Sequence, residues 1–387
     1  MKKLSRDAKF ILGGEYYIFF LLGIYTLMVG SVVPQIRAEY GVSYEFSGYM
    51  ISACTTGIIA MNLISSYTAI LLGLKRAYII QHALVIIGYV AVTISGNHTL
   101  LILGMVFIGF ARGSTSNYSN QIVNDITKSN IKYMNIMAAF FAVGACVAPF
   151  VMILSSDVAG NWRLASYGLS IAAAVGIVLT LFMKLNREGS GTEGEKRGGL
   201  AFFKRKKYLV SLIAMFFYSG VEISIIGWLV TFFMEVQGTT TQFASAMATL
   251  LWASILVGRI VCSLIASRMT AAKFIFVLSV GVAAFMALFV CEVGLALQIA
   301  ATIGLGLFMS GIYSTILVNT GSILSEFKLA FGYFFMLSGL GPVILPAIIG
   351  VIAERRDVLT GVRTLAIAAA ALLVISIVNL RLEKAEG

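Results

Sequence analysis

The sequence predicts an all-α membrane protein whose twelve transmembrane helices form two six-helix bundles. Of its 387 residues, 59% are hydrophobic and only 12% are charged, whereas soluble globular domains carry about 25% charged residues. The mean hydropathy is +0.95. The sequence lacks the short segments of alternating hydrophobicity that are typical of outer-membrane barrels. The membrane-spanning segments are therefore expected to be helices.

Twelve apolar runs are each long enough to cross a bilayer of about 30 Å as a helix. They are predicted at roughly 12–35, 46–72, 77–97, 99–122, 134–155, 164–185, 209–234, 242–266, 273–292, 294–319, 329–352 and 361–380. Short links after the third and the ninth run predict tight antiparallel hairpins at these two places.

Basic residues predict the orientation of the chain. With a cytoplasmic N-terminus, 21 Lys and Arg lie on the cytoplasmic side, five lie outside and two lie within spans. Because cytoplasmic loops are enriched in Lys and Arg, both termini are predicted to be cytoplasmic. Topology therefore accounts for the net charge of +11, and no nucleic-acid partner is expected. The N-terminal segment is basic and then apolar but lacks a small-residue cleavage site, so it is expected to be retained.

The chain divides into two similar halves. Residues 1–185 are predicted to form the N-terminal six-helix bundle, 186–208 a cytoplasmic basic linker, and 209–387 the C-terminal six-helix bundle. A shift of 197 residues superposes the six spans of each half and matches Gly144 with Gly341. Duplicated six-span halves are typical of transporters whose site lies between the halves near the middle of the bilayer.

Two charged residues lie deep within apolar runs. Glu222 stands in YSGVEISIIGW, in a 26-residue run with no other charge, and Arg112 stands in GFARGSTSNYSNQ. A charge in the bilayer costs at least about 2.5 kcal/mol and usually faces a partner or a water-filled path. Glu222 is therefore predicted to be a proton-coupling carboxylate. Arg112 is predicted to bind substrate or to pair with Glu222, and a permanent structural ion pair is the alternative.

Polar and aromatic side chains in several spans complete the predicted substrate site. Hydroxyl and amide groups share the helical face of Arg112, and this density is hard to explain against lipid. Sugars are commonly held by amides, carboxylates and an aromatic plane. Besides Arg112, the predicted substrate-binding residues are Tyr25, Asn117, Asn120, Gln121, Asn135, Trp228 and Tyr313. Helix packing is the alternative role for each of them.

Four further residues are predicted to act in gating. Arg76 and Arg259 lie toward the cytoplasmic ends of their spans, and Pro149 and Pro346 mark kinks that let the bundles move. No cofactor and no metal is expected. The sequence contains no His-Glu-x-x-His, Walker or Gly-x-Ser-x-Gly motif, so it is not expected to be an enzyme.

These features together resemble the major facilitator superfamily, and the resemblance covers nearly the whole chain. The loop motif that follows the second span in this family is degraded here, because Gly73, Lys75 and Arg76 are present but Ile70 replaces the acid. The segments YSGVEISIIGW, WASILVGR, MNIMAAFFAVGACVAP and SGIYSTIL are similar to those of the fucose:proton symporter group.

The resemblance implies a secondary transporter of the cell membrane that works by alternating access, and the protein is expected to be a monomer. It implies proton-coupled symport of a sugar or a similar small polar solute across the lipid bilayer. Two other transport functions stay open from the residues, namely an organic-anion carrier that uses Arg112 and a multidrug exporter. The polar run from Ser114 to Gln121 counts against the exporter. A receptor or scaffold without transport is the remaining alternative.

Overall fold

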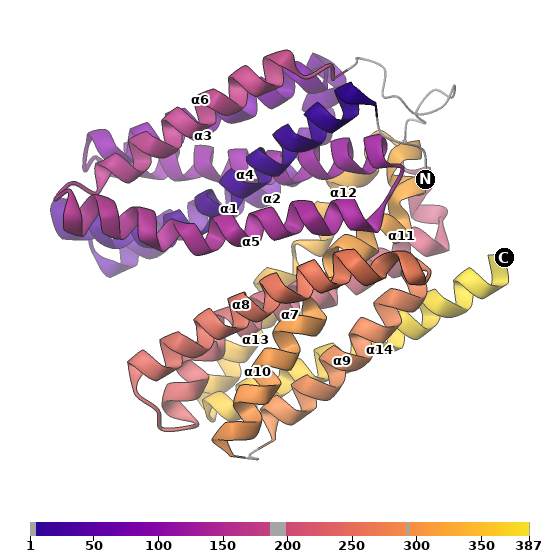
Figure 1. Ribbon diagram of the computed structural model, residues 1–387. Coiled ribbons are helices and arrows are strands. Elements are labelled where there is room, and N and C mark those ends of the chain that lie inside the picture. Colours follow the sequence, from indigo (N-terminus) through magenta and orange to yellow (C-terminus); the bar gives the residue numbers. More distant parts are fainter. Residues whose placement is uncertain (1–4, 186–198, 292–293, 387) are drawn as a thin grey trace. The chain divides into compact units, whose positions relative to one another are not determined.

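The computed structural model describes residues 5–185, 199–291 and 294–386, most of which are helical (Figure 1). Within this part of the chain, twelve helical segments are long and apolar enough to cross a membrane, so the predicted number of spans is confirmed. The first six spans are α1 (Arg6–Tyr40), α2 (Tyr44–Leu72), α3 (Leu74–Ile94), α4 (His98–Thr127), α5 (Ile131–Ile153) and α6 (Arg163–Phe182). The cytoplasmic location of the termini stays a prediction.

Two of the last six spans are interrupted. The seventh to ninth and the twelfth spans are α7 (Lys206–Glu235), α8 (Thr241–Ile265), α9 (Ala271–Val290) and α14 (Val358–Glu386). The tenth span consists of α10 (Leu295–Met309) and α11 (Ile312–Glu326), and the eleventh of α12 (Ala330–Ser338) and α13 (Gly341–Arg355). The breaks fall at Ser310–Gly311 and Gly339–Leu340, whereas α4 and α5 run unbroken through the corresponding positions of the first half.

The chain forms two compact units, and each includes a short segment from the other predicted half. Of the described residues, the first unit contains 5–128, 137–185 and 324–336, and the second contains 129–136, 199–291, 294–323 and 337–386. In the first unit, Ser325 accepts a hydrogen bond from Asn124 at 2.9 Å and donates one to Asp125 at 2.5 Å. Most of the predicted linker, at 186–198, lies outside the described residues.

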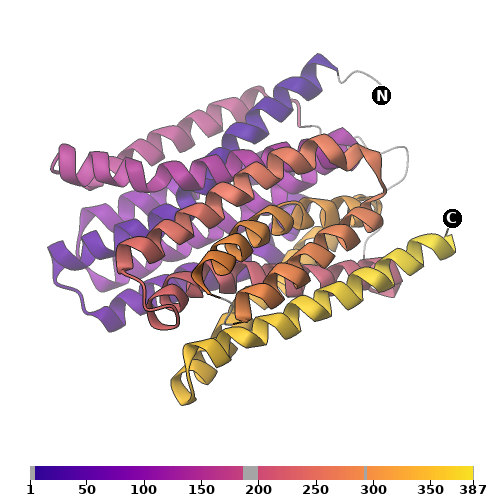
Figure 2. The same cartoon turned by 60° about the horizontal axis from the view of Figure 1, so that its bottom comes forward.

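The same pairs of helices pack together within each unit, as expected for a duplicated bundle (Figures 1 and 2). Helix α4 packs against α2 and α3, as α10 packs against α8 and α9. Helix α6 packs against α3 and α1, as α14 packs against α9 and α7. A Cβ atom at Gly144 would lie 1.9 Å from the carbonyl oxygen of Phe20, and one at Gly341 would lie 2.1 Å from that of Phe216. The two glycines matched by the 197-residue shift thus occupy equivalent close contacts between helices.

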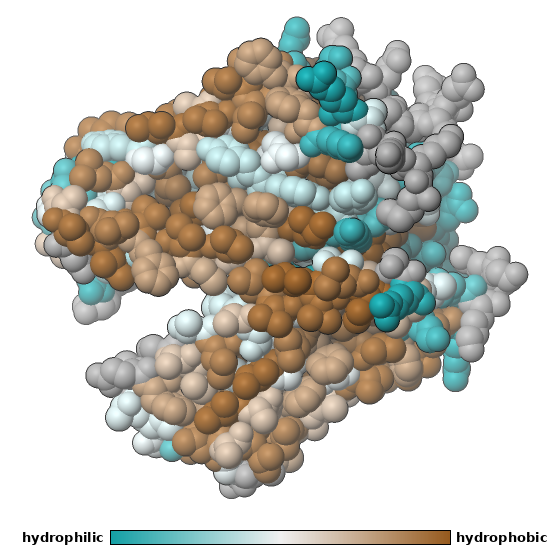
Figure 3. Space-filling view, viewed as in Figure 1, coloured by the Kyte–Doolittle hydropathy of each residue, from teal (hydrophilic) through white to brown (hydrophobic). Residues whose placement is uncertain are grey.

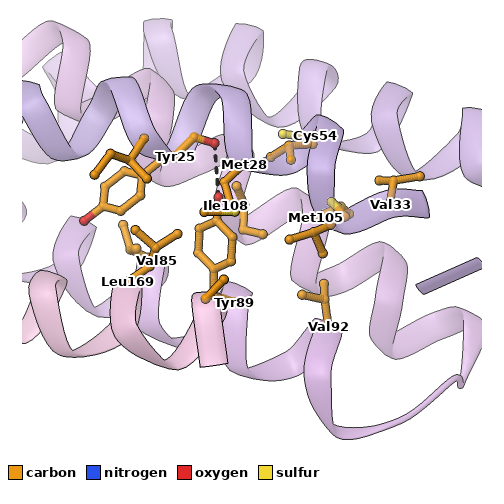
Figure 4. Packing of buried hydrophobic residues seen from close by; sticks show 14 of the residues in the cluster. Tyr25, Met28, Val33, Cys54, Val85, Tyr89, Val92, Met105, Ile108 and Leu169 are labelled. Carbon is orange, nitrogen blue, oxygen red and sulfur yellow. Dashed lines mark hydrogen bonds between the residues drawn. The ribbon is translucent and has the colours of Figure 1, made fainter. Parts of the chain in front are cut away.

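Apolar side chains fill the first unit and also cover the sides of the helices. Met28, Met105 and Ile108 pack around Tyr89, whose hydroxyl donates a hydrogen bond to the carbonyl oxygen of Tyr25 at 3.1 Å (Figure 4). On the face shown in Figure 3, hydrophobic side chains lie along the helices and the most hydrophilic ones gather near helix ends. Exposed apolar side chains along a helix are suited to contact with lipid tails.

Candidate functional site

Four side chains from three helices of the second unit form the first part of the candidate site. Tyr218 and Glu222 lie one turn apart on α7, Arg259 lies on α8, and Tyr313 lies on α11. Tyr218 is almost completely buried and interacts electrostatically with the other three. Glu222, which is half-buried, also interacts electrostatically with Arg259. The cluster therefore joins one acid, one base and two phenols.

Local helix geometry explains how these groups meet. Residues four apart lie on the same face of a helix, so Tyr218 and Glu222 point to the same side of α7. On α8, Gly258 lets this helix approach α10 closely, since a Cβ atom there would lie 2.7 Å from the carbonyl oxygen of Leu307. The next residue, Arg259, is only 6% exposed. The break at Ser310–Gly311 directly precedes the turn of α11 that carries Tyr313.

Trp228 lies farther along α7, against another helix. Its side chain is half-buried, and its Cζ2 atom lies 3.5 Å from the position that a Cβ atom of Gly350 on α13 would occupy. Its predicted role as an aromatic plane for substrate stays untested. The described contact agrees equally well with helix packing.

Arg112 lies on α4 of the first unit, beside α2 and α3. Its Nη1 atom donates a weak hydrogen bond to Cys54 Sγ at 3.5 Å, and its guanidinium interacts electrostatically with the Tyr89 phenol. Among the described residues, Arg112 Nε and the Tyr25 hydroxyl have no hydrogen-bond partner. Arg112 and Glu222 belong to different units, so direct pairing between them stays a prediction.

The predicted amide ligands differ in how many of their hydrogen-bonding groups already have partners within the protein. Asn117 donates to the Asn62 carbonyl oxygen and to Ser65 Oγ, both on α2, so it binds α4 to α2. Asn120 donates to the Ser116 carbonyl oxygen of its own helix at 2.7 Å. Gln121 is half-buried. Asn135 on α5 is completely buried, and within the described part of the chain neither its Oδ1 nor its Nδ2 has a partner.

The predicted gating residues occupy separate places. Arg76 is exposed and, together with Lys75, lines a surface pocket of about 320 Å³ between the end of α2 and the start of α3. Pro149 and Pro346 lie inside α5 and α13. Arg259 is brought beside Glu222, which the sequence reasoning did not foresee. The gating roles of all four stay predictions.

Sequence reasoning overlooked Glu15. This carboxylate lies on α1 and is completely buried, and it is the one charged residue of the apolar run from Phe10 to Gln35. The signal that identified Glu222, a single charge within a long apolar run, therefore also identifies Glu15. Glu15 escaped notice because it lies near the start of the run, where acidic side chains commonly face the membrane surface.

In the described part of the chain, twelve apolar spans with repeated packing enclose ionisable groups in both units, a combination that is typical of multi-pass membrane transporters. The model of the Major Facilitator Superfamily matches residues 16–326. The chain belongs to this family, as the sequence resemblance indicated. It is accordingly a transporter of the plasma membrane and not an enzyme.

Several relatives and solved structures match most of the chain. The Protein TsgA homolog of Buchnera aphidicola subsp. Baizongia pistaciae (strain Bp) is 22% identical over 308 residues, which are 78% of each chain. The glucose/mannose transporter GlcP of Bacillus subtilis (strain 168) is 21% identical over 332 residues, 81% of this chain and 80% of its own.

Two solved structures of symporters share the fold. A variant of the E. coli fucose:proton symporter FucP aligns with a TM-score of 0.81 and 18% identity, over 97% of this chain and 99% of its own. The proton:xylose symporter XylE aligns with a TM-score of 0.79 and 11% identity, over 97% of this chain and 95% of its own.

Proposed function

We propose that the protein is a secondary active transporter that moves a sugar or a similar small polar solute together with protons, by alternating access. The observation that carries this proposal is that Glu222 interacts electrostatically with Arg259, and that Tyr218 interacts electrostatically with both of them and with Tyr313. The names of GlcP, FucP and XylE, which describe sugar transport or proton symport, support the substrate class and the coupling ion. The protein is proposed to act as a monomer in the lipid bilayer.

The proposed coupling rests on the charge of Glu222. When Glu222 is ionised, it neutralises Arg259 in surroundings of low dielectric, where an unpaired charge is costly. A proton on Glu222 removes this neutralisation, so that the guanidinium of Arg259 can bind an acceptor of the solute. The hydroxyl oxygens of a sugar are such acceptors, and the two phenols can accept or donate hydrogen bonds beside them. Proton binding and solute binding thereby favour each other, which is the linkage that symport requires.

Transport assays on purified protein in proteoliposomes test this proposal. Glucose, mannose, fucose and xylose are supplied in turn, with and without an inward proton gradient. We expect at least one of them to accumulate with the gradient and to stop accumulating when a protonophore is added. Glu222→Gln should lose gradient-driven accumulation and retain counterflow, because exchange of bound solute needs no change in protonation. Ile223→Leu, which alters the neighbouring and 43% exposed side chain on α7, is the matched control and should transport normally.

Two results would overturn the proposal. One is accumulation by the wild-type protein that does not depend on the proton gradient. The other is full gradient-driven uptake by Glu222→Gln.

An organic-anion carrier is the second candidate, and it is favoured by Arg112. This guanidinium has only a thiol as a described hydrogen-bond partner, and its Nε has none among the described residues. The planar fork of arginine matches a carboxylate or phosphate in a way that lysine cannot. Arg112→Lys should therefore abolish the binding of carboxylate or phosphate solutes in a thermal-shift assay. Unchanged binding of such solutes by Arg112→Lys would exclude this candidate.

A further inference from the structure

A second buried carboxylate lies in the first unit, away from the groups used above. Glu15 on α1 accepts a hydrogen bond from the Tyr78 hydroxyl on α3, with 2.7 Å between Oε2 and the phenol oxygen. The same phenol oxygen lies 2.7 Å from Ser119 Oγ on α4. All three side chains have 0% exposure. Side chains of three helices thus form one continuous chain of hydrogen bonds.

The three residues lie at the same end of the unit. Glu15 follows the start of α1, Tyr78 follows the start of α3, and Ser119 precedes the end of α4, each within roughly 6–14 Å of that helix end. In the predicted orientation this is the cytoplasmic half of the membrane. The cluster is therefore distinct from the contact that Arg112 makes with Cys54 on α2.

Apolar side chains surround the carboxylate. Ile11 and Ile18 lie one turn on either side of Glu15 on α1, and both belong to a buried cluster with Tyr78, Tyr118 and Met183. The Oε1 atom of Glu15 has no hydrogen-bond partner among the described residues. An ionised carboxylate buried without a partner for its charge is strongly unfavourable, so such a group binds a proton instead.

The titratable groups around Glu15 do not supply a counter-charge. On α3 these are Tyr78 and His82, whose rings lie 5.2 Å apart, and His82 is completely buried with no described hydrogen-bond partner on Nε2. On α4 the nearest is Tyr118, which packs edge-on against Tyr78. On α1 the nearest are the phenols of Tyr16 and Tyr17, and Tyr17 packs against the same cluster while its hydroxyl donates to the Ala172 carbonyl oxygen at 3.0 Å. Tyr25, farther along α1, interacts electrostatically with Tyr78. From the end of α6, Met183 approaches α1 at Gly14. Lys184, which follows Met183, pairs with Asp7, and Arg163 pairs with Glu39, so neither of these cations pairs with Glu15.

The hydrogen-bond chain suits a neutral acid. A protonated Glu15 can donate to Tyr78, and Tyr78 can then donate to Ser119, so the polar contacts are kept and no charge is buried. Loss of the proton reverses the direction of both bonds and leaves a charge in the apolar cluster. The chain of hydroxyl groups can thus take up either arrangement without movement of its heavy atoms.

We propose that Glu15, Tyr78 and Ser119 form a second proton-binding site, separate from Glu222, whose carboxyl group holds a proton at neutral pH. The site requires no transported solute. The proposal can therefore be tested whether or not the protein proves to be a symporter.

Infrared spectroscopy of the purified protein in lipid nanodiscs tests this proposal. The C=O stretch of a protonated carboxyl group is separate from that of a carboxylate. At neutral pH we expect the wild-type protein to show a protonated-carboxyl band that Glu15→Gln lacks. Glu222→Gln should retain this band whether or not Glu222 serves transport. Glu39→Gln, which removes an acid near a helix end, is the matched control and should also retain it.

Tyr78→Phe keeps the test informative if Glu15→Gln does not fold. Loss of the phenol removes the hydrogen-bond partner of the acid, so we expect the band to shift to higher frequency while the carboxyl group stays protonated. The proposal is overturned if the wild-type and Glu15→Gln spectra coincide at neutral pH. It is equally overturned if the wild-type band appears only on acidification, or if Tyr78→Phe leaves its position unchanged.

Discussion

The contact between α7 and α13 at Gly341 provides a quantitative test of the repeated packing. In Gly341→Ala, the new Cβ atom would lie 2.1 Å from the carbonyl oxygen of Phe216, whereas ordinary contacts of this kind begin at 3.4 Å. The two backbones must therefore separate by about 1 Å, because neither partner is a flexible side chain. Overpacking of this kind costs typically about 1–3 kcal/mol.

A thermal-unfolding assay of the purified protein in one detergent measures this effect. Gly350→Ala on the same helix is the matched control, since its nearest contact would be an ordinary 3.5 Å to Trp228. Both variants replace glycine by alanine within α13, but Gly341 is its first residue and Gly350 lies in its interior, where alanine gains about 1 kcal/mol of helix propensity, so each variant is also compared with the wild-type protein. We expect Gly341→Ala to unfold at a clearly lower temperature than Gly350→Ala. Equal midpoints for the two variants would refute the reasoning from close helix contact.

Three further predictions concern the second unit. Glu222→Asp should retain part of the gradient-driven uptake that Glu222→Gln loses, as measured by initial rates in proteoliposomes. Equal initial rates for Glu222→Asp and Glu222→Gln would contradict the need for a carboxylate. In a double-mutant cycle of thermal stability, Glu222→Gln and Arg259→Gln should show a coupling of about 0.5–3 kcal/mol, and additive effects would exclude a direct interaction. Asn319→Leu should lower thermal stability by about 0.6–1.7 kcal/mol, because Asn319 Nδ2 donates to Ser211 and Asn379 on neighbouring helices; unchanged stability would show that these bonds contribute nothing.

Composition and periodicity were sufficient to predict the helical fold. A run of about 20 apolar residues can cross a bilayer in only one way that satisfies its backbone, which is as a helix. The repeat was equally readable, because Gly144 and Gly341 recur at one spacing and make equivalent contacts. The breaks at Ser310–Gly311 and Gly339–Leu340 were not foreseen, because hydropathy stays high across both.

The candidate site was predictable only in part. The cost of an isolated charge identified Glu222, but its neighbour depends on the rotation of each helix about its axis and on side-chain length. Depth suggested Arg112 as a partner of Glu222, which stays a prediction, and within the second unit the structure places Arg259 within electrostatic range of Glu222. Asn117 is a second example. The sequence identifies it as a polar side chain within a span, but it does not reveal that groups on α2 already accept its hydrogen bonds.

The exchange of short segments between the units has a consequence for the integrity of the chain. Ser325 belongs by sequence to the second half but forms hydrogen bonds with Asn124 and Asp125 in the first unit. Conversely, residues 129–136 lie in the first half of the sequence but belong to the second unit. A fragment that ends in the linker therefore lacks part of the first unit, and its counterpart lacks part of the second. We therefore expect the two fragments to form complete units only when they are produced together.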